Sequence, residues 1–355
     1  MRAHTARTAL SSIAALALIT GLAACGQSDA AAPAATSSQL PTVKLMVGGI
    51  DKQIYLPYQL AQGLGYYKKY GVNVELSTES SGGVAAEDAL ASGQVDMAGA
   101  WYLHAIEFQD KGKNIIDVVQ LSGAPGEREM CANGSNVTTP AGWKGKNVGV
   151  TDLGSGTDDL TRYLATKSSL TTQDFTRVGV GAGSTFVSAL QNGKIVCGMT
   201  TQPTVTAIEK KKLGYSAIDL ATTAGVTKAL GGAWPAACVL ANADWVNSHK
   251  GAVQAVVNAL VATLQYIKTH SAADIADHLP PAFVSNGVVT RDDYIAALTQ
   301  DKGQFLSDGI MPANGPQTVL DMLKLVGKVK NTVDLSTTYT NTFATAADAA
   351  VGAGQ

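Results

Sequence analysis

Two short segments of the 355-residue sequence combine hydroxyl side chains with glycine in a way that suits an anion or a polar head group. They are 80–83 (SSGG) and 154–157 (GSGT), and each stands directly before a stretch with helical spacing. N–H groups at a helix N-terminus carry partial positive charge and donate hydrogen bonds to an oxyanion, although Ser and Gly also serve plain turns and caps there. The candidate ligand-binding residues in them are Ser81, Gly82, Ser155, Gly156 and Thr157.

The motifs of common enzyme classes do not occur in the sequence. It has no Gly-x-Ser-x-Gly nucleophile elbow, no His-Glu-x-x-His and no phosphate loop ending in Gly-Lys-Ser/Thr. Its 5 histidines are scattered and no Cys-x-x-Cys is present, which argues against a metal site. We therefore expect a binding protein without catalytic residues, metal or cofactor.

The start of the sequence has the features of a secretory signal peptide. Arg2 and Arg7 give a positive start, and residues 9–22 are mostly apolar or small. That stretch is too short to span a bilayer, which takes roughly 20 apolar residues. A charged start, a short apolar core and small residues before a cleavage point are typical of a signal peptide. We expect residues 1–24 to be removed from the mature protein.

The cleavage point indicates a lipid anchor. Residues 22–26 read Leu-Ala-Ala-Cys-Gly, which resembles the bacterial lipobox, where the cysteine is lipidated and becomes the new N-terminus. We therefore expect Cys25 to be the lipidation site. Two or three acyl chains on it would hold the protein stably at a membrane. Residues 25–40 are small and polar and predict a disordered tether. The protein would be exported and anchored to the outer face of the cell membrane, or to its periplasmic side.

Charge and length limit the remaining possibilities. The sequence has 26 basic and 28 acidic residues and no basic tract, which argues against a nucleic-acid partner. A folded body of about 310 residues exceeds the usual size of one hydrophobic core and indicates two lobes.

Strands and helices alternate along the chain. Residues 43–47 predict a strand, 56–64 carry leucine at helical spacing, and 72–76 predict the next strand. The segment 90–95 (LASGQV) has a counterpart at 190–195 (LQNGKI), so the same helix, glycine and strand corner recurs in the second half. Strands separated by helices imply parallel pairing with helices on both sheet faces. The pattern predicts an α/β protein with two similar lobes.

Several local motifs in this order resemble the solute-binding proteins of ABC importers for nitrate, sulfonate, taurine and thiamine-precursor solutes. The most specific is LAQGLGYYKKYGVNVEL at 60–76, which resembles the first helix of that family and the turn into its second strand. The others are 89–97 (ALASGQVDM), 143–150 (WKGKNVGV) and 307–311 (SDGIM). The similarity runs from about residue 43 to about residue 329.

The resemblance implies a type II periplasmic-binding-protein fold, in which two α/β lobes are joined by two chain crossings and hold a ligand cleft between them. We expect crossings near 122–127 and 232–236. The expected divisions are 41–124 for the first part of lobe I, 125–235 for lobe II, 236–340 for the return strand and C-terminal helices that complete lobe I, and 341–355 for an Ala-rich tail that frays.

The expected lobe crossings bear on how the remaining cysteines pair. Once Cys25 is lipidated, Cys131, Cys197 and Cys238 remain, and the oxidising environment of an exported protein permits disulfides. Cys131 and Cys238 lie in short segments near the expected lobe junction, so we expect them to pair. Cys197 stands in an apolar strand and is expected to be a buried free thiol.

In such a fold the loops at the carboxyl ends of the strands face the cleft. The candidates that this adds are Asp51, Trp101, His104, Ser184, Thr201, Gln202 and Trp234. Asp51 is a candidate either for a solute amine or for a helix cap, His104 either for the pocket or for a structural role, and Trp234 either for stacking on a solute or for packing the hinge. Around Thr201 the chain lacks the acidic and aromatic residues of many relatives, so the solute cannot be copied from them.

The resemblance implies delivery of a small organic solute to the permease and ATPase subunits of an ABC importer. Neutral polar loops before helices favour an anion such as a sulfonate, taurine or nitrate. The Trp and His candidates and the lack of a convincing pocket arginine also suit a flat heterocycle, a thiamine-precursor pyrimidine or a flavin. A ligand-sensing lipoprotein without transport is a further alternative. We expect a monomer that meets the membrane through the lipid on Cys25.

Overall fold

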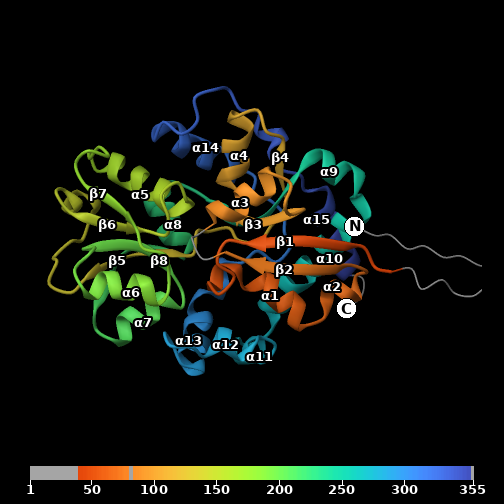
Figure 1. Ribbon diagram of the computed structural model, residues 1–355, viewed down its shortest axis with the longest axis horizontal. Coiled ribbons are helices and arrows are strands. Elements are labelled where there is room, and N and C mark those ends of the chain that lie inside the picture. The colour runs from red at the N-terminus through yellow and green to blue at the C-terminus, as the bar shows by residue number, and fades with distance from the viewer. Residues whose placement is uncertain (1–38, 80–82, 353–355) are drawn as a thin grey trace, which may run out of the picture. The chain divides into compact units, whose positions relative to one another are not determined.

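The computed structural model describes residues 39–79 and 83–352 (Figure 1). Its fold lies in the unit Leu40–Gln355. Within the described residues, ten strands form two mixed sheets of five strands each, and helices surround both sheets. The predicted α/β architecture with two lobes is confirmed, and each lobe is named here by its sheet.

The first sheet has the order β2-β1-β3-β10-β4. Its strands are β1 (Thr42–Val47), β2 (Asn73–Thr78), β3 (Met97–Trp101), β4 (Ile115–Gln120) and β10 (Ala237–Asn242). β1 pairs in parallel with β2 and β3, whereas β10 is antiparallel to both β3 and β4. The first lobe is therefore a parallel core into which a strand from much later in the chain is inserted.

The second sheet repeats this arrangement with the order β7-β6-β8-β5-β9. Its strands are β5 (Glu127–Ala132), β6 (Asn147–Val150), β7 (Thr176–Gly179), β8 (Cys197–Thr201) and β9 (Gly214–Leu220). β6 is parallel to β7 and β8, and the inserted strand β5 is antiparallel to β8 and β9. The chain passes from the first sheet to the second between β4 and β5, and it returns just before β10.

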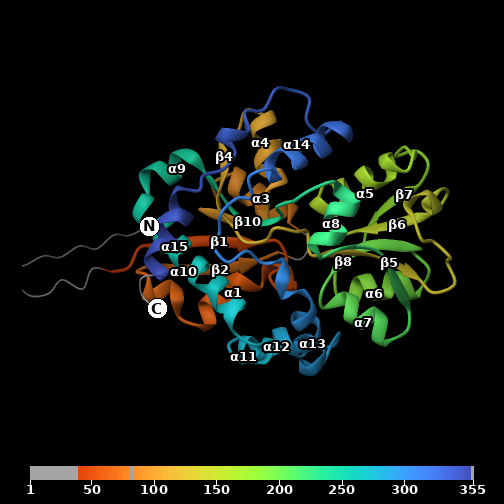
Figure 2. The same ribbon diagram turned by 180° about the vertical axis from the view of Figure 1, so that it is seen from behind.

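Helices cover both faces of each sheet, as Figures 1 and 2 show. The first lobe has η1 (Gln53–Tyr55), α1 (Leu56–Gly63), α2 (Tyr66–Lys69), α3 (Val84–Ala91) and α4 (Leu103–Asp110), and the second lobe has η2 (Pro140–Trp143), α5 (Gly156–Lys167), α6 (Ser184–Gln191), α7 (Thr204–Lys210) and α8 (Thr223–Leu230). In the views, α3 and α4 lie above the first sheet and α1 and α2 below it, while α5 and α8 lie above the second sheet and α6 and α7 below it.

The predicted recurring corner is present in both lobes. Gly93 ends α3 before β3, and Gly193 ends α6 before β8. Their φ angles are 74° and 67°, in the left-handed region that residues with a Cβ rarely adopt.

The remaining helices follow β10. They are α9 (Ala243–Ser248), α10 (Lys250–Thr269), α11 (Ala272–Asp277), α12 (Pro281–Val284), α13 (Arg291–Asp301), η3 (Lys302–Gln304), α14 (Gly315–Leu325), η4 (Leu335–Thr337) and α15 (Thr342–Gly352). The expectation of a tail that frays is wrong for 342–352, because α15 packs against α10 and buries Ala344 and Ala347 completely. Alanine has the highest helix propensity of the amino acids, so this composition favours a helix. Among the described residues, no helix is both long enough and apolar enough to cross a membrane.

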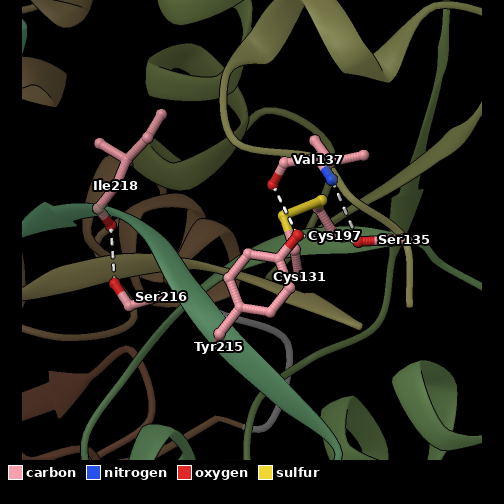
Figure 3. Close-up of a disulfide and its surroundings, with 7 residues drawn as sticks. All are labelled: Cys131, Ser135, Val137, Cys197, Tyr215, Ser216 and Ile218. Carbon is pink, nitrogen blue, oxygen red and sulfur yellow. Dashed lines mark hydrogen bonds between the residues drawn. A yellow bond between two sulfur atoms is a disulfide. The ribbon is translucent and has the colours of Figure 1, made fainter. Parts of the chain in front are cut away.

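The disulfide joins neighbouring strands of the second lobe. Cys131 on β5 stands opposite Cys197 on β8, and the two sulfurs are bonded (Figure 3). Close by, the hydroxyl of Tyr215 donates a hydrogen bond to the carbonyl oxygen of Val137 at 2.9 Å. The expected pair of Cys131 with Cys238 is wrong, because β10 carries Cys238 into the other sheet. Cys238, not Cys197, is the buried free cysteine of the described chain.

Candidate functional site

A small polar cavity lies where the two lobes meet, at the ends of strands from both sheets. It is lined by Lys52, Ile54, Tyr55, Glu87, Trp101, His104, Glu127, Thr151, Gly156 and Thr157. The volume open to the centre of a water molecule is about 10 Å³, so the cavity holds about one water. Of the predicted site residues, Trp101, His104, Gly156 and Thr157 are brought together here.

His104 is held between two carboxylates. Its Nε2 is 2.9 Å from Glu87 Oε1, and its Nδ1 is 2.9 Å from Glu107 Oε2. Burial disfavours a charge on this ring, but the two carboxylates outweigh burial and raise the pKa of His104 to about 10. The imidazolium in turn, against the effect of burial, lowers the pKa of Glu107 to about 2. At neutral pH, His104 is therefore a cation in the cavity wall.

Lys52 and Glu127 bring a second cation and a further carboxyl to the cavity. Lys52 Nζ donates a hydrogen bond to the carbonyl oxygen of Gly48 at 2.8 Å. Burial lowers the pKa of Lys52, and nearby carboxylates, Glu127 first among them, oppose this shift. Glu127 is only 4% exposed, and burial raises its pKa to about 8 despite the opposing charges of Lys52 and Arg128. Its Oε2 atom has no hydrogen-bond partner among the described residues.

Two tryptophans and one glycine form a close contact at the cavity. The rings of Trp101 and Trp234 pack edge to face with centroids 5.4 Å apart. A Cβ on Gly156 would lie 2.1 Å from Cε3 of Trp101, so only glycine fits where the first turn of α5 meets this ring. Trp234 is fully buried, packs against the ring of Trp101 and does not line the cavity.

The hydroxyl groups at the start of α5 and in the loop before it bond mainly to one another and to the main chain. Ser155 caps the helix by accepting a hydrogen bond from the N–H of Asp158, and its Oγ donates to the carbonyl oxygen of Asp152 at 2.8 Å. Thr157 Oγ1 lies 2.7 Å from Thr151 Oγ1 and 2.9 Å from Ser155 Oγ. Ser155 therefore shapes the loop, while Thr151 and Thr157 face the cavity.

Four other predicted residues lie outside the cavity lining. Asp51 is exposed and borders an outer hollow with Thr78 and Phe283. Ser184 is exposed at the start of α6 and borders a groove on the second lobe. Thr201 Oγ1 donates to the carbonyl oxygen of Gly126 at 2.7 Å.

Gln202 is buried and joins the lobes through its main chain. Its carbonyl oxygen accepts a hydrogen bond from the N–H of Gln53 at 3.0 Å, and its side-chain oxygen accepts from Thr206. The predicted Ser81, Gly82 and Cys25 lie outside the described residues.

Sequence reasoning missed most of the charged lining. Lys52 follows the candidate Asp51 directly, Glu87 is in the helix after the 80–83 loop, and Glu127 is at the first predicted crossing. Each was therefore beside a segment already singled out. The spacing of Glu87 and Glu127 in the sequence did not indicate a shared site, because the two residues belong to different lobes.

Further ion pairs lie near the cavity but outside its lining. Lys328 Nζ is 3.2 Å from both Glu107 Oε1 and Asp159 Oδ1, so it bridges α4 of the first lobe and α5 of the second. On the other side of β5, Arg128 forms two hydrogen bonds with Asp301 at 2.6 and 2.7 Å. Arg128 is buried in this pair and does not reach the cavity lining.

One group of residue types that ligate metals is close together in the described chain. Glu129, Cys131 and Cys197 have ligand atoms within 4.8 Å of one another. The two sulfurs are joined in the disulfide, so they offer no thiolate to a metal ion.

Two α/β lobes of this topology have the periplasmic-binding-protein fold, and solved structures of periplasmic binding proteins share it. A family model described as "NMT1/THI5 like" matches residues 54–274, so the chain belongs to this family. A search among curated proteins found no match.

Three solved structures illustrate the likeness. A protein from Bordetella bronchiseptica RB50 is 27% identical, with a TM-score of 0.81 over 88% of this chain and 98% of that one. The alkanesulfonate-binding protein SsuA from Xanthomonas axonopodis pv. citri, bound to MOPS, is 15% identical, with a TM-score of 0.66 over 86% and 99%. The periplasmic nitrate-binding protein NrtA from Synechocystis PCC 6803 is 17% identical, with a TM-score of 0.69 over 88% and 89%. At these identities the last two show the fold alone.

Proposed function

We propose that this protein is the extracytoplasmic solute-binding subunit of an ABC importer and binds a small organic anion in the cavity between its lobes. The observation that carries the proposal is a pair of cations, half-buried Lys52 and buried, protonated His104, in a cavity to which both lobes contribute. Buried charges persist in proteins where they are paired or meet a ligand. The sulfonate and nitrate named for the two structural neighbours are anions, in agreement with this charge.

Binding in this fold would couple solute capture to lobe closure. The cavity has room for about one water in the described conformation, so a solute must enter while the lobes are apart. On closure, Lys52 of the first lobe would donate hydrogen bonds to the acid group, and the positive charge of His104 would attract it, although both ring nitrogens of His104 stay bound to carboxylates. Thr151 and Thr157 of the second lobe would add hydrogen bonds. Trp101 would cover the apolar part of the solute. The permease and ATPase subunits would recognise the closed lobes and supply the energy of transport.

We further propose export and lipid anchoring through Cys25, with residues 25–40 as the tether. The support is the signal-peptide pattern and the lipobox-like segment at 22–26. Mass spectrometry of protein extracted from host membranes should find acyl chains on Cys25 as the N-terminal residue. The Cys25→Ser variant should leave the membrane fraction, and equal membrane retention of the variant would contradict the anchor.

Binding, and not catalysis, suits the chemistry of the lining. The imidazole of His104 has both nitrogens engaged by carboxylates, so it is not placed to activate a neighbouring hydroxyl. The hydroxyls of Thr151 and Thr157 bond to each other. These groups are arranged to hold a polar molecule.

A thermal-shift screen tests the proposal. The purified protein is heated with sulfonates, taurine, nitrate, aromatic acids, pyrimidines and flavins, and a ligand at 100 times its Kd should add about 2.7 kcal/mol of stability. The Lys52→Gln variant should lose the shift given by an anion. Lys146→Gln, which changes an exposed lysine in the same way, should keep it. If no solute class shifts the melting temperature of folded protein, the proposal fails.

A further inference from the structure

The helix α14 and the turn after it, residues 315–328, are fastened to the first lobe at both ends, and we call this segment the α14 strap. Before the strap, the carbonyl oxygen of Gly309 accepts a hydrogen bond from the N–H of Gln120 on β4 at 3.0 Å. After it, the carboxylate of Asp110 at the end of α4 accepts a hydrogen bond from the N–H of Asn331 at 2.7 Å. The strap therefore belongs to the first lobe.

The α14 strap also contacts the second lobe. The helix α14 lies between α4 and α5 and packs on both of them (Figures 1 and 2). On α5, Arg162 donates a hydrogen bond to the carbonyl oxygen of Val326, and Oδ1 of Asp159 is 3.2 Å from Nζ of Lys328. Unlike the two chain crossings, these contacts are non-covalent, so they can break when the lobes separate and form again on closure.

Lys328 lies between a carboxylate of each lobe. Its Nζ is also 3.2 Å from Oε1 of Glu107, and the other oxygen of Glu107 is 2.9 Å from Nδ1 of His104 in the cavity wall. Against the effect of burial, Glu107 and Asp159 raise the pKa of Lys328, which keeps its charge. Without this charge, the closed lobes would hold two buried carboxylates near each other. Like charges repel, and a buried charge without a partner is destabilising.

We infer that Lys328 is a positioning residue that clasps the second lobe to the first and so sets how long the closed lobes retain a solute. The inference rests on the proposed function where it concerns the solute, whereas the clasp itself is a property of the empty protein. The Lys328 side chain is 26% exposed, so solvent screens its ion pairs in part. Its loss should therefore shift the ratio of open to closed lobes by about 5- to 30-fold, less than expected for a fully buried pair.

The clasp is tested without solute, by the labelling rate of a thiol placed inside the cavity. Thr157 of the second lobe borders the cavity and is 3% exposed, so Thr157→Cys gives a thiol that a reagent reaches when the lobes part. The Cys25→Ser chain is labelled with neutral iodoacetamide at pH 8 and followed by mass spectrometry. Burial raises the pKa of Asp159 to about 7, so at pH 8 this carboxyl is ionised. Where closing is faster than labelling, the rate is proportional to the open fraction.

The buried free Cys238 reports unfolding in the same sample. In Lys328→Gln the thiol at position 157 should be labelled about 5- to 30-fold faster, while the labelling of Cys238 stays unchanged. Lys328→Arg keeps the charge and should stay close to wild type. Lys324→Gln, which changes an exposed lysine of the same helix, should behave as wild type. Loss of a nearby positive charge raises the pKa of a thiol and slows its labelling, so this side effect opposes the expected result.

A second variant covers the case in which Lys328→Gln does not fold. Asp159→Asn weakens the same contact from the other lobe and should also accelerate labelling at position 157. Unchanged labelling there would overturn the inference. Equal acceleration at position 157 and at Cys238 would overturn it as well, because it would show a general loss of stability and not an opening of the lobes.

Propanesulfonate is the probe for solute retention. Stopped-flow fluorescence should show dissociation from Lys328→Gln about 5- to 30-fold faster than from wild type, because the closed lobes must open before the solute leaves. Equal dissociation rates would refute the link to solute retention. If neither propanesulfonate nor any other solute of the thermal-shift screen binds to the wild type, the proposed function has failed, and the labelling rates still decide whether Lys328 clasps the lobes.

Discussion

The two inserted strands, β5 and β10, occupy the same place in the two sheets but have opposite chemistry. Each is fourth in its sheet, is antiparallel to both neighbours, and has its register shifted between its third and fourth residues. β10 reads ACVLAN and is apolar over its buried length, whereas β5 reads EREMCA and begins with three buried ionisable residues. Strand position therefore does not dictate polarity in this fold.

β10 serves only to stabilise the fold, whereas β5 also contributes a residue to the candidate binding cavity. β10 contributes burial of apolar area, which favours folding without further partners. Burial of Glu127, Arg128 and Glu129 costs free energy unless each charge is compensated. Arg128 is paired with Asp301, Glu127 faces the cavity, and Glu129 has no partner for either oxygen within the described residues. Three predictions test this unequal arrangement.

The largest effect is expected from Asp301→Asn. Asp301 and the side chain of Arg128 are almost fully buried. In the variant the amide oxygen could still accept one hydrogen bond from Arg128, but the charge at position 301 is lost, and the ion pair that remains is the longer contact of Arg128 Nε with Asp219, at 3.5 Å. Removal of one partner of a buried ion pair typically costs about 3–5 kcal/mol. Urea unfolding should show this loss. Asp277→Asn, which removes the acid of the exposed pair with Arg291, is the matched control and should unfold almost as wild type. Equal effects of the two variants would contradict the role of β5.

The next effect concerns the cysteines of the two strands. Replacement of Cys131 and Cys197 by serine should lower the free energy of unfolding by about 2–4 kcal/mol, because the disulfide closes a loop with a sequence separation of 66. Cys238→Ala, on β10, should cost about 1 kcal/mol, as for other small changes in a core. Unfolding in a reducing buffer should remove most of the difference between wild type and the double variant. An unchanged difference under reduction would rule out the disulfide as its cause.

The smallest effect is the pH dependence conferred by Glu129. Burial raises the pKa of Glu129 well above its ordinary value, so the folded protein keeps a proton there that the unfolded chain releases. Stability of the wild type should therefore fall as pH rises above about 5, by at most about 1.4 kcal/mol per pH unit. Glu129→Gln lacks this titration, so the difference in stability between the two should grow as pH rises from 5, by at most about 1.4 kcal/mol per pH unit. Stability curves that stay parallel over this range would show that Glu129 is ionised in the folded state.

The site was predictable in part. Trp101, His104, Gly156 and Thr157 follow or end strands of the two sheets, and the rule that ligands bind at the carboxyl ends of strands placed them in the cavity. The same rule also selected Asp51 and Ser184, which are exposed and lie outside the cavity. The rule predicts the region of the fold in which a residue lies, and not the direction of its side chain. Glu127 escaped the rule because β5 runs antiparallel, so its cavity end is its first residue.

The sequence by itself determined the elements and their order, because helical and strand periodicity and glycine corners such as Gly93 and Gly193 act over a few residues. It thereby fixed an α/β chain with two similar halves. Only the tertiary structure decided which strands became neighbours. Cys131 pairs with Cys197 and not with Cys238 because β5 is inserted beside β8, while β10 returns to the first sheet. The meeting of Lys52, His104 and Glu127 depends in the same way on contacts between segments far apart in the chain, which no local pattern encodes.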